Sequence, residues 1–362
     1  MFVPGGQFTV GVEEELLLVD EEHQLVDEEC GRRWIGRTGE VGRPEIGTVS
    51  IELFGSEIEF ATAVCADGVS AARHLSDLRA VLMATGARAM AVGLHPDAAF
   101  GEPQVTHAPR YQLIGDELAG VLRTPTAALQ VHVGLPDAAS AVTAYRALRQ
   151  HLPVLRALAA GSPFWHGRDS GLASARAAVI ASYPRSGIPP VVRSWDEYVA
   201  VTRDVIAAAG APDHSYVWWG ARIQARLGTV EVRVMDAQPS LAVVAGLTAL
   251  VQGIAAYALD HPPVTDIPTE VLAENDFRVV RRGLETTILD ATGTLRPVRA
   301  IALDALVKAG SALRPLGLDA PLAGVQRLLA SEPEYDRQRR VHGAGGMRAL
   351  LADLVERTTR GW

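Results

Sequence analysis

A run of glutamates near the start of the chain raises the first chemical question. The stretch "GVEEELLLVD", residues 11–20, places Glu13, Glu14 and Glu15 among apolar side chains, and the pattern over residues 7–19 alternates well enough for a β-strand. Successive side chains of a strand point to opposite faces, so Glu13 and Glu15 share one face and Glu14 lies on the other. We therefore expect Glu13 and Glu15 to line a polar surface, while the face of Glu14 packs on the core.

Three other segments alternate in the same way and carry ionisable side chains on one face. "TVEVRVMD" sets a glutamate and an arginine against three valines, "LQVHVGL" sets a histidine against two valines, and "EIEF" puts two glutamates on one face. A further glutamate comes slightly earlier, in "SIELF". These residues are Glu52, Glu57, Glu59, His132, Glu231 and Arg233. If the segments belong to a single sheet, their ionisable side chains share one of its faces.

A sheet face with this lining would bind hard divalent cations. Residues i and i+2 lie roughly 6.6 Å apart along a strand, close enough for two carboxylates to flank ions that are about 3.5 to 4 Å apart in paired sites. Carboxylates buried without a partner are destabilising, and a cation would offset that cost. Carboxylate oxygens with one imidazole favour Mg²⁺ or Mn²⁺ over zinc.

Each segment alone also has an ordinary structural explanation. Three consecutive glutamates are typical of a solvated helical turn, and His132 alone would be a hydrogen-bonded structural histidine. Glu231 and Arg233 would form an ion pair on an exposed sheet face. The joint occurrence of these residues in alternating segments favours the functional explanation.

The distribution of patterns along the chain predicts an α+β protein without a clear linker. Strand-like patterns recur up to about residue 240, and helical patterns dominate from about 241 to 362, so we expect a single domain with a strand-rich core and a helical C-terminal part. The predicted strands span about 7–19, 57–64, 88–96, 126–135 and a pair within 216–236 that turns at Leu227 and Gly228. The predicted helices span about 69–90, 138–160, 240–261, 269–283, 296–309 and 344–359. Residues 162–190 are predicted to form a long ordered loop, and residues 28–47 a lid or surface loop.

Composition excludes several classes of protein. The formal net charge is −8 and the basic residues are scattered, so neither nucleic acid nor an anionic membrane is an expected partner. Lys308 is the single lysine and lies outside any phosphate-binding Walker loop. Cys30 and Cys65 are far apart and form no zinc or disulfide motif. With no signal-peptide pattern and no long uncharged apolar run, we expect a cytoplasmic protein.

Several spaced motifs resemble the type 2 glutamate–cysteine ligases, also called carboxylate–amine ligases, which share the glutamine synthetase fold. The motifs are "FTVGVEEELLLVD", "EIEFATAVCAD", "GLHP", "RYQ", "QVHVG", "ALAAGSPFWHGRDSGLASARAAVIASYP", "GTVEVRVMDAQPSL" and, near the end, "GAGGMRALLADLVE". The resemblance covers most of residues 7–285. It implies an open, curved antiparallel sheet with helices packed on one face, like the catalytic domain of glutamine synthetase.

The resemblance also implies a reaction and a set of residues that perform it. A carboxylate would attack the γ-phosphate of ATP, and an amine would then displace phosphate from the acyl phosphate, giving an amide such as γ-glutamylcysteine. The implied metal ligands for Mg²⁺ or Mn²⁺ are Glu13, Glu15, Glu52, Glu59, His132 and Glu231. Arg233, beside the transferred phosphoryl group, and Glu59 are the implied catalytic residues, and Arg110, Arg176 and Arg222 are implied to bind substrate or ATP. A homodimer is implied by the resemblance alone.

Two departures from the family pattern leave the amino-acid substrates open. Where the family tends to have Trp-Asp-x-Arg, this chain has Trp219, Gly220, Ala221 and Arg222, and Gln130 stands where a second histidine is frequent. The same residues would also suit a metal-dependent amide hydrolase or a nucleotide-binding protein without turnover. Product formation without ATP would indicate the hydrolase, and nucleotide binding without consumption of ATP would indicate the binding protein.

Overall fold

An open, antiparallel β-sheet is the centre of the computed structural model, which describes residues 1–39, 45–101, 104–118 and 120–362. The strand order is β10-β11-β5-β1-β3-β2, and β4 pairs with β1. The strands are β1 (Val10–Val19), β2 (Gly47–Ile51), β3 (Glu57–Thr62), β4 (Arg88–Met90), β5 (Ala128–Gly134), β10 (Ala221–Gln224) and β11 (Thr229–Asp236). The four strands predicted to carry ionisable residues, β3, β1, β5 and β11, are therefore neighbours.

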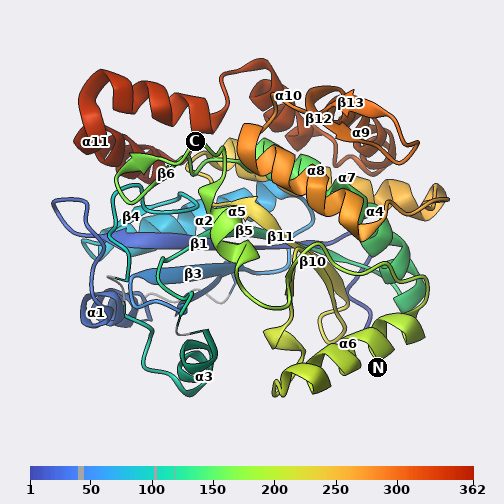
Figure 1. Ribbon diagram of the computed structural model, residues 1–362, viewed down its shortest axis with the longest axis horizontal. Coiled ribbons are helices and arrows are strands. Elements are labelled where there is room, and N and C mark those ends of the chain that lie inside the picture. The colour runs from blue at the N-terminus through green and yellow to red at the C-terminus, as the bar shows by residue number, and fades with distance from the viewer. Residues whose placement is uncertain (40–44, 102–103, 119) are drawn as a thin grey trace.

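Helices pack on one face of this sheet in two layers. Helices α2 (Gly68–Ala84), α4 (Ala138–Ala159) and α7 (Leu241–Asp260) contact the strands. Their apolar side chains and those of the strands form the main hydrophobic core. Outside them lie α8 (Thr269–Arg282), α9 (Val298–Leu313), α10 (Ala323–Ala330) and α11 (Glu334–Arg360), which gather along the upper side of Figure 1. The predicted α+β class with helices behind an antiparallel sheet is confirmed.

The other side of the sheet is only partly covered. Here lie the helices α3 (Pro109–Leu118) and α5 (Ala175–Ala181). Helices α1 (Glu28–Gly39) and α6 (Trp195–Ala209) lie toward the lower edge of Figure 1 and contact the core helices α2 and α4, respectively. Side chains of α3 and α5 form a second, smaller hydrophobic cluster, separate from the main core. A sheet face that is covered by short helices and loops can hold a cavity, and this one does.

The sequence patterns predicted some segments incorrectly. Residues 28–39, expected in a lid or loop, form α1, while residues 40–44 of that prediction lie outside the described residues. The expected loop at 162–190 contains α5 and the short strands β6 (Phe164–Trp165), β7 (Arg168–Asp169) and β8 (Ser186–Gly187), the last paired with β9 (Trp218–Trp219). Helix α11 begins about ten residues before its predicted start. Helices α3, α6 and α10 and the hairpin of β12 (Thr287–Leu289) and β13 (Leu295–Pro297) were not predicted.

Helix α7 has the length and apolar composition of a membrane span, but its surroundings explain that composition differently. The apolar window of α7 is 83% buried inside the protein. It contacts α2, α4, α9 and α10 as well as β5. A helix that is apolar all round and enclosed by other elements is a core helix. The single-domain organisation of the chain stays a prediction.

The central glutamate of the opening motif is part of the core. Glu14 is fully buried, and its carboxylate accepts hydrogen bonds from Nε and Nη2 of Arg79 on α2 at 2.8 and 2.5 Å. The Arg79 guanidinium also donates to the carbonyl oxygens of Gln238, Pro239 and Thr358. A buried charge pair is tolerated only when its hydrogen bonds are satisfied, and these contacts satisfy them. Glu14 therefore ties β1 to α2 and to the C-terminal end of α11.

We predict that Glu14→Gln lowers the free energy of unfolding by about 3 to 5 kcal/mol, because it leaves the buried Arg79 without its counter-charge. Chemical denaturation in EDTA measures this loss. Glu13→Gln is the matched control, since Glu13 is the preceding residue of the same strand but faces the opposite side. Equal destabilisation by the two substitutions would contradict the structural role assigned to Glu14.

Candidate active site

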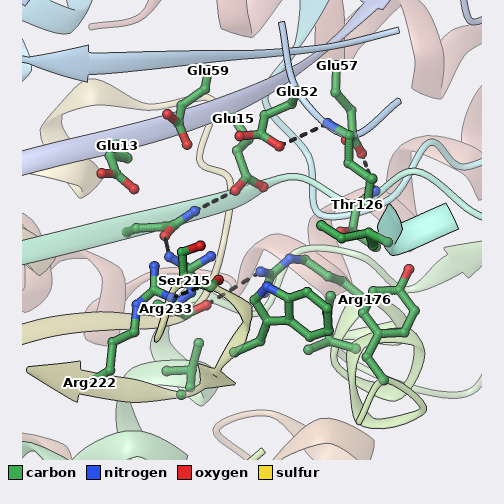
Figure 2. Close-up of a pocket in the computed structure, with 18 of the residues that line it drawn as sticks. Glu13, Glu15, Glu52, Glu57, Glu59, Thr126, Arg176, Ser215, Arg222 and Arg233 are labelled. Carbon is green, nitrogen blue, oxygen red and sulfur yellow. Dashed lines mark hydrogen bonds between the residues drawn. The ribbon is translucent and has the colours of Figure 1, made fainter. Parts of the chain in front are cut away.

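The exposed side of the sheet forms the floor of a cavity of about 300 Å³. Strand register decides which side chains meet there: Glu15 lies opposite Glu59, Glu13 opposite Gln130, and His132 opposite Glu231. Directly opposed residues of antiparallel strands point to the same face. Figure 2 shows the glutamates of β1 and β3 along one side of the cavity and the arginines along the other.

Three of the predicted ligands come together into a candidate metal centre. One ligand atom each from Glu13, His132 and Glu231 lie within 4.8 Å of one another. Nε2 of His132 is 3.3 Å from Oε1 of Glu13, and Nδ1 is 3.0 Å from Oγ1 of Thr229. Within the described part of the chain, Nε2 is buried without a well-formed hydrogen bond. A histidine whose Nδ1 is held by a hydroxyl, with Nε2 directed at two carboxylates, has the arrangement of a metal ligand.

Protonation follows from the charges in this centre. Burial alone lowers the pKa of His132, but the charges of Glu231 and Glu13 outweigh it and raise the pKa above its ordinary value. For Glu13, burial raises the pKa, and the hydrogen bond and charge of His132 outweigh that effect, so the net shift is downward. The two carboxylates thus favour the protonated form of His132, and the imidazole favours the ionised form of Glu13.

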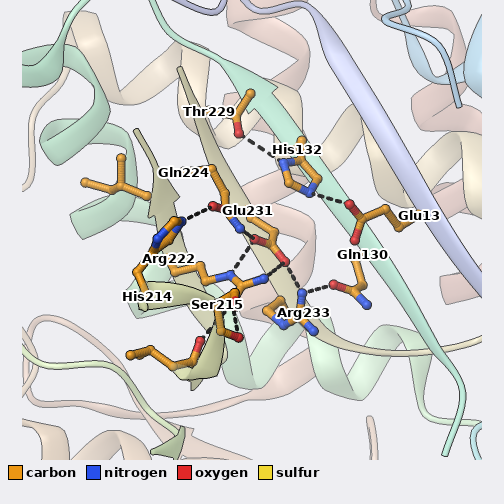
Figure 3. A network of polar contacts seen from close by, with 12 residues as sticks. Glu13, Gln130, His132, His214, Ser215, Arg222, Gln224, Thr229, Glu231 and Arg233 are labelled. Carbon is orange, nitrogen blue, oxygen red and sulfur yellow. Dashed lines mark hydrogen bonds and ion pairs between the residues drawn. The ribbon is translucent and has the colours of Figure 1, made fainter. Parts of the chain in front are cut away.

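Glu231 lies at the centre of a hydrogen-bond network drawn in Figure 3. Its carboxylate is fully buried and accepts from Nε of Arg222 at 2.7 Å, from Nη2 of Arg222 at 3.3 Å, from the Gln224 amide at 2.7 Å and from Arg233. Burial raises the pKa of Glu231, but the charges of Arg233, Arg222 and His132 hold it well below its ordinary value. The carboxylate is therefore ionised, and each of its oxygens accepts two hydrogen bonds.

A second group of carboxylates lies beside this centre. Glu15 accepts from the backbone N–H of Ala128 at 2.7 Å and from the Gln130 amide, and Glu52 accepts from its neighbour's N–H at 2.9 Å. Burial and the charge of Glu15 raise the pKa of Glu52 to about 7. Burial and the charges of Glu52, Glu13 and Glu15 hold the pKa of Glu59 well above its ordinary value. These carboxyl groups repel one another, and a divalent cation would relieve that repulsion.

The predicted arginines occupy different places around the cavity. Arg233 extends from β11 and donates to Glu231 and to the amide oxygen of Gln130. Arg222, on β10, donates to Glu231 and to the carbonyl oxygens of Ser215 and Val217. Arg110, on α3 at the cavity edge, donates to the hydroxyl and the carbonyl oxygen of Ser215. Arg176, on α5, is buried at the other side of the cavity. All of the predicted site residues except His132 and Glu231 line the cavity, and those two adjoin it through Glu13 and Arg233.

Some lining residues were not assigned a role from the sequence. Glu57 shares the face of Glu59, as the alternation indicated, but its carboxylate accepts from the backbone N–H groups of Thr126 and Phe54. Arg156, Tyr183 and Trp218 come from α4 and from irregular segments, where no sequence period indicates the direction of a side chain. Only Glu57 carried a signal that sequence analysis could have used.

The two departures from the family pattern have local structural explanations. Gln130 bridges the two groups of charges, because its amide nitrogen donates to Glu15 and its amide oxygen accepts from Arg233. At Gly220 a Cβ atom would lie 2.6 Å from Cγ1 of Val234, so any side chain there requires Val234 to move. The position of an aspartate in the family motif is therefore closed by packing in this chain.

Comparison with known proteins identifies the family. The model of glutamate–cysteine ligase family 2 matches residues 9–352. The chain belongs to this family. It is 37% identical over 358 residues to a Rubrobacter xylanophilus protein provisionally named glutamate–cysteine ligase 2-3, covering 97% of both chains. It is also 33% identical to the glutamate–cysteine ligase of Haloferax volcanii, covering 96% of both. The protein is thus an enzyme of the ligase class.

Solved structures agree on the fold. The glutamate–cysteine ligase of Francisella tularensis in complex with AMP superimposes with a TM-score of 0.73 at 12% identity, covering 99% of this chain and 90% of that one. A bifunctional glutathione synthetase from Pasteurella multocida gives a TM-score of 0.70 at 13% identity and covers 98% of this chain and 52% of that one. At such low identity the likeness concerns the fold alone.

The carboxyl pKa values predict how pH controls metal binding. A carboxyl whose pKa is raised in the folded protein stabilises the fold while it is protonated, and for Glu52 this stability is lost as pH rises from the ordinary pKa of 4.5 through about 7. The pKa values of Glu13 and Glu231 are lowered, so their contribution to the stability of the fold changes only at pH values below this range. Without metal, the site should therefore destabilise the fold increasingly between about pH 5.5 and pH 8, and Mn²⁺ should raise Tm more at about pH 8 than at about pH 5.5.

Differential scanning calorimetry with and without Mn²⁺ measures this effect. The control variant loses one carboxylate from each group, Glu13→Gln with Glu59→Gln, and it should show a much smaller rise of Tm at either pH. A rise that is independent of pH, or one that persists in the control, would place the metal elsewhere.

Proposed function

We propose that the protein forms an amide bond between a carboxylate, that of the glutamate side chain, and an amine, with ATP and Mg²⁺ or Mn²⁺. The carboxylate first takes the γ-phosphoryl group of ATP, releasing ADP, and the amine then displaces phosphate from the acyl phosphate. One observation carries the proposal: Glu13, His132 and Glu231 converge within 4.8 Å, directly beside Arg233 on the same sheet face. Phosphoryl transfer needs such a combination of metal ligands and a guanidinium, because its catalysis is mainly positioning and charge neutralisation.

Two groups of residues would hold the metal ions. Glu13, His132 and Glu231 form the first, and Glu15, Glu52 and Glu59 the second. Nε2 of His132, which lies 3.3 Å from Oε1 of Glu13 without a well-formed hydrogen bond among the described residues, and the mutual repulsion of the carboxyl groups both fit a divalent cation. When bound, the ions would neutralise the phosphate oxygens of ATP.

Arg233 is placed to exchange one partner for another. Arg233 donates to Glu231 and Gln130, and each oxygen of Glu231 accepts two hydrogen bonds. A carboxylate has about four lone-pair sites, so Glu231 gains a free one only when Arg233 turns away. We infer that Arg233 turns toward the transferred phosphoryl group. This movement would free Glu231 as a metal ligand at the moment when the new anion arrives.

Arg222 has a different role in this proposal. Its guanidinium is saturated by Glu231, Val217 and Ser215. We therefore assign it to positioning Glu231, rather than to the substrate binding that the family resemblance implied. Arg110, exposed at the cavity edge and stacked 4.9 Å from the ring centre of Tyr216, is accessible to an anionic substrate group.

Release of ADP tests the proposed function. The enzyme with Mg²⁺ and ATP should release ADP only when both glutamate and an amine are present, and the mass of the product should equal that of the amide. Product without ATP would indicate a hydrolase. ATP that binds but is not consumed with any pair of substrates would indicate a protein without turnover.

Replacing the arginine beside the phosphoryl group should lower kcat. Arg233→Met should reduce kcat roughly 10²- to 10³-fold, since it removes a donor aimed at developing charge. Steady-state ADP release measures this change. The control is Arg203→Met on α6, where an exposed arginine pairs with Asp204 away from the cavity. If Arg233→Met kept full kcat, the assignment of Arg233 would be wrong.

The cytoplasmic location and the homodimer stay predictions.

A further inference from the structure

The cavity has an apolar wall in addition to its carboxylates. Leu53, Tyr111 and Ile114 line one part of it, and Leu118, Ile180 and Trp218 line the rest. All six belong to the second hydrophobic cluster or pack against it, and four of them are only half-buried. A half-buried apolar side chain inside a cavity gains by contact with an apolar ligand group. Metal ions and phosphate groups would gain no binding free energy from contact with these apolar side chains.

A guanidinium without a full counter-charge lies in the same cavity. The side chain of Arg176 is 5% exposed, and in the described part of the chain its Nε makes no hydrogen bond. Its nearest carboxylate, Asp236, is 3.8 Å away, and it donates to the carbonyl oxygen of Arg233 at 3.4 Å. Asp236 already accepts from Ser162, Ser174 and the N–H of Gly161. A buried cation held so loosely fits an anionic ligand group.

A buried hydroxyl lies between this cation and the carboxylates. Oη of Tyr183 lines the cavity wall and, among the residues described, has no hydrogen-bond partner. Burial raises the pKa of Tyr183, the charge of Glu57 raises it further and the charge of Arg176 lowers it. Both charges therefore act on this hydroxyl. A zwitterion could set its carboxylate at Arg176 and Tyr183 and its ammonium group toward the glutamates.

We propose that the amine substrate is an α-amino acid with a branched aliphatic or aromatic side chain. Its carboxylate binds Arg176 and Tyr183, and its side chain fills the wall formed by Leu53, Ile114, Leu118, Ile180 and Trp218. The inference rests on the proposed ligase function, because the amine must reach the acyl phosphate at the carboxylate cluster.

The apolar wall of the cavity fits the amine substrate better than it fits glutamate or ATP. The glutamate that supplies the reacting carboxylate is polar at both ends, so it gains little from an apolar wall. ATP brings an aromatic base, but it offers no carboxylate for Arg176. An amino acid that reacts through its amine has one carboxylate and one free side chain, matching one loosely held cation and one apolar surface.

A panel of amines tests the inference through kcat/KM for ADP release with glutamate as the acid. Leucine should exceed alanine roughly 10- to 100-fold, the range for burying a few methylenes. Ile180→Ser should reduce this ratio severalfold without changing the KM for ATP. Ala178→Ser is the matched control, a half-buried position on the same helix outside the cavity lining. If Ile180→Ser raised the KM for ATP and left the leucine-to-alanine ratio of kcat/KM unchanged, the wall would bind the nucleotide base, and the proposal would be wrong.

The carboxylate subsite is tested with leucine and its decarboxylated analogue, isopentylamine. The wild-type enzyme should prefer leucine, and Arg176→Met should abolish that preference. Tyr183→Phe keeps the ring and removes only the hydroxyl, and it should weaken the preference for leucine. This variant tests the subsite if Arg176→Met fails to fold. Equal use of both amines by the wild-type enzyme would overturn the subsite.

Calorimetry separates this inference from the proposed function. Binding of leucine and of alanine is measured with Mg²⁺ and a non-hydrolysable ATP analogue. If no pair of substrates releases ADP, the proposed function fails, but tighter binding of leucine, lost in Arg176→Met, would still support the site. If ADP is released with alanine or serine as readily as with leucine, the ligase function stands and the apolar wall has no role in substrate choice.

Discussion

Repulsion among carboxylates on one sheet face is the constraint on which the rest of the structure depends. Glu13, Glu15, Glu52, Glu57 and Glu59 line a single cavity, with the buried Glu231 beside it. The protein neutralises part of this charge through Arg222 and Arg233, which both pair with Glu231. Glu52, Glu57 and Glu59 keep their protons at pH values where exposed carboxyl groups would lose them. Under the proposed function, a bound cation would relieve this repulsion, and the relief would contribute to the free energy of cation binding.

The alternation of β-strands makes this concentration of charge compatible with a stable fold. Side chains on one face of β1, β3, β5 and β11 can all be ionisable because those on the other face are valine, leucine, isoleucine and phenylalanine packed on α2, α4 and α7. Glu14 is the exception on the apolar face, and Arg79 compensates its charge completely. The glutamate triplet thus divides into two residues that create the site and one that joins the layers behind it.

The sequence could predict which side chains share a face, but not which strands are neighbours. A period of two residues placed Glu13, Glu15, Glu59, His132 and Glu231 correctly relative to their own strands. The pairing of Glu15 with Glu59 and of His132 with Glu231 depends on register between segments that are far apart in the chain. The long core helices were also predicted from sequence, although α7 is apolar all round and has no polar face.

The rest of the cavity is built from segments without a period. Helix α5 has seven residues and lies within a stretch rich in Gly, Ser and Pro, so no sequence window reveals that Arg176 and Ile180 face one cavity. Helix α1 was mistaken for a loop because its sequence is rich in Gly and Arg, although Trp34 and Ile35 of this helix pack against the main core. Tyr183 and Trp218 are brought to the wall by tertiary packing between α5, β8 and β9. The metal-binding candidates on regular strands could be predicted from sequence, whereas the lining residues on irregular segments could be found only from the structure.

The central claim is that Glu13, His132 and Glu231 bind a divalent cation next to Arg233. Anomalous diffraction from crystals grown with Mn²⁺ and a non-hydrolysable ATP analogue tests it most directly. The account predicts a Mn²⁺ peak bonded to Nε2 of His132 and to oxygens of Glu13 and Glu231, with the Arg233 guanidinium turned from Glu231 to the γ-phosphate. A nucleotide bound without Mn²⁺ at these three residues, with Arg233 still paired to Glu231, would contradict it.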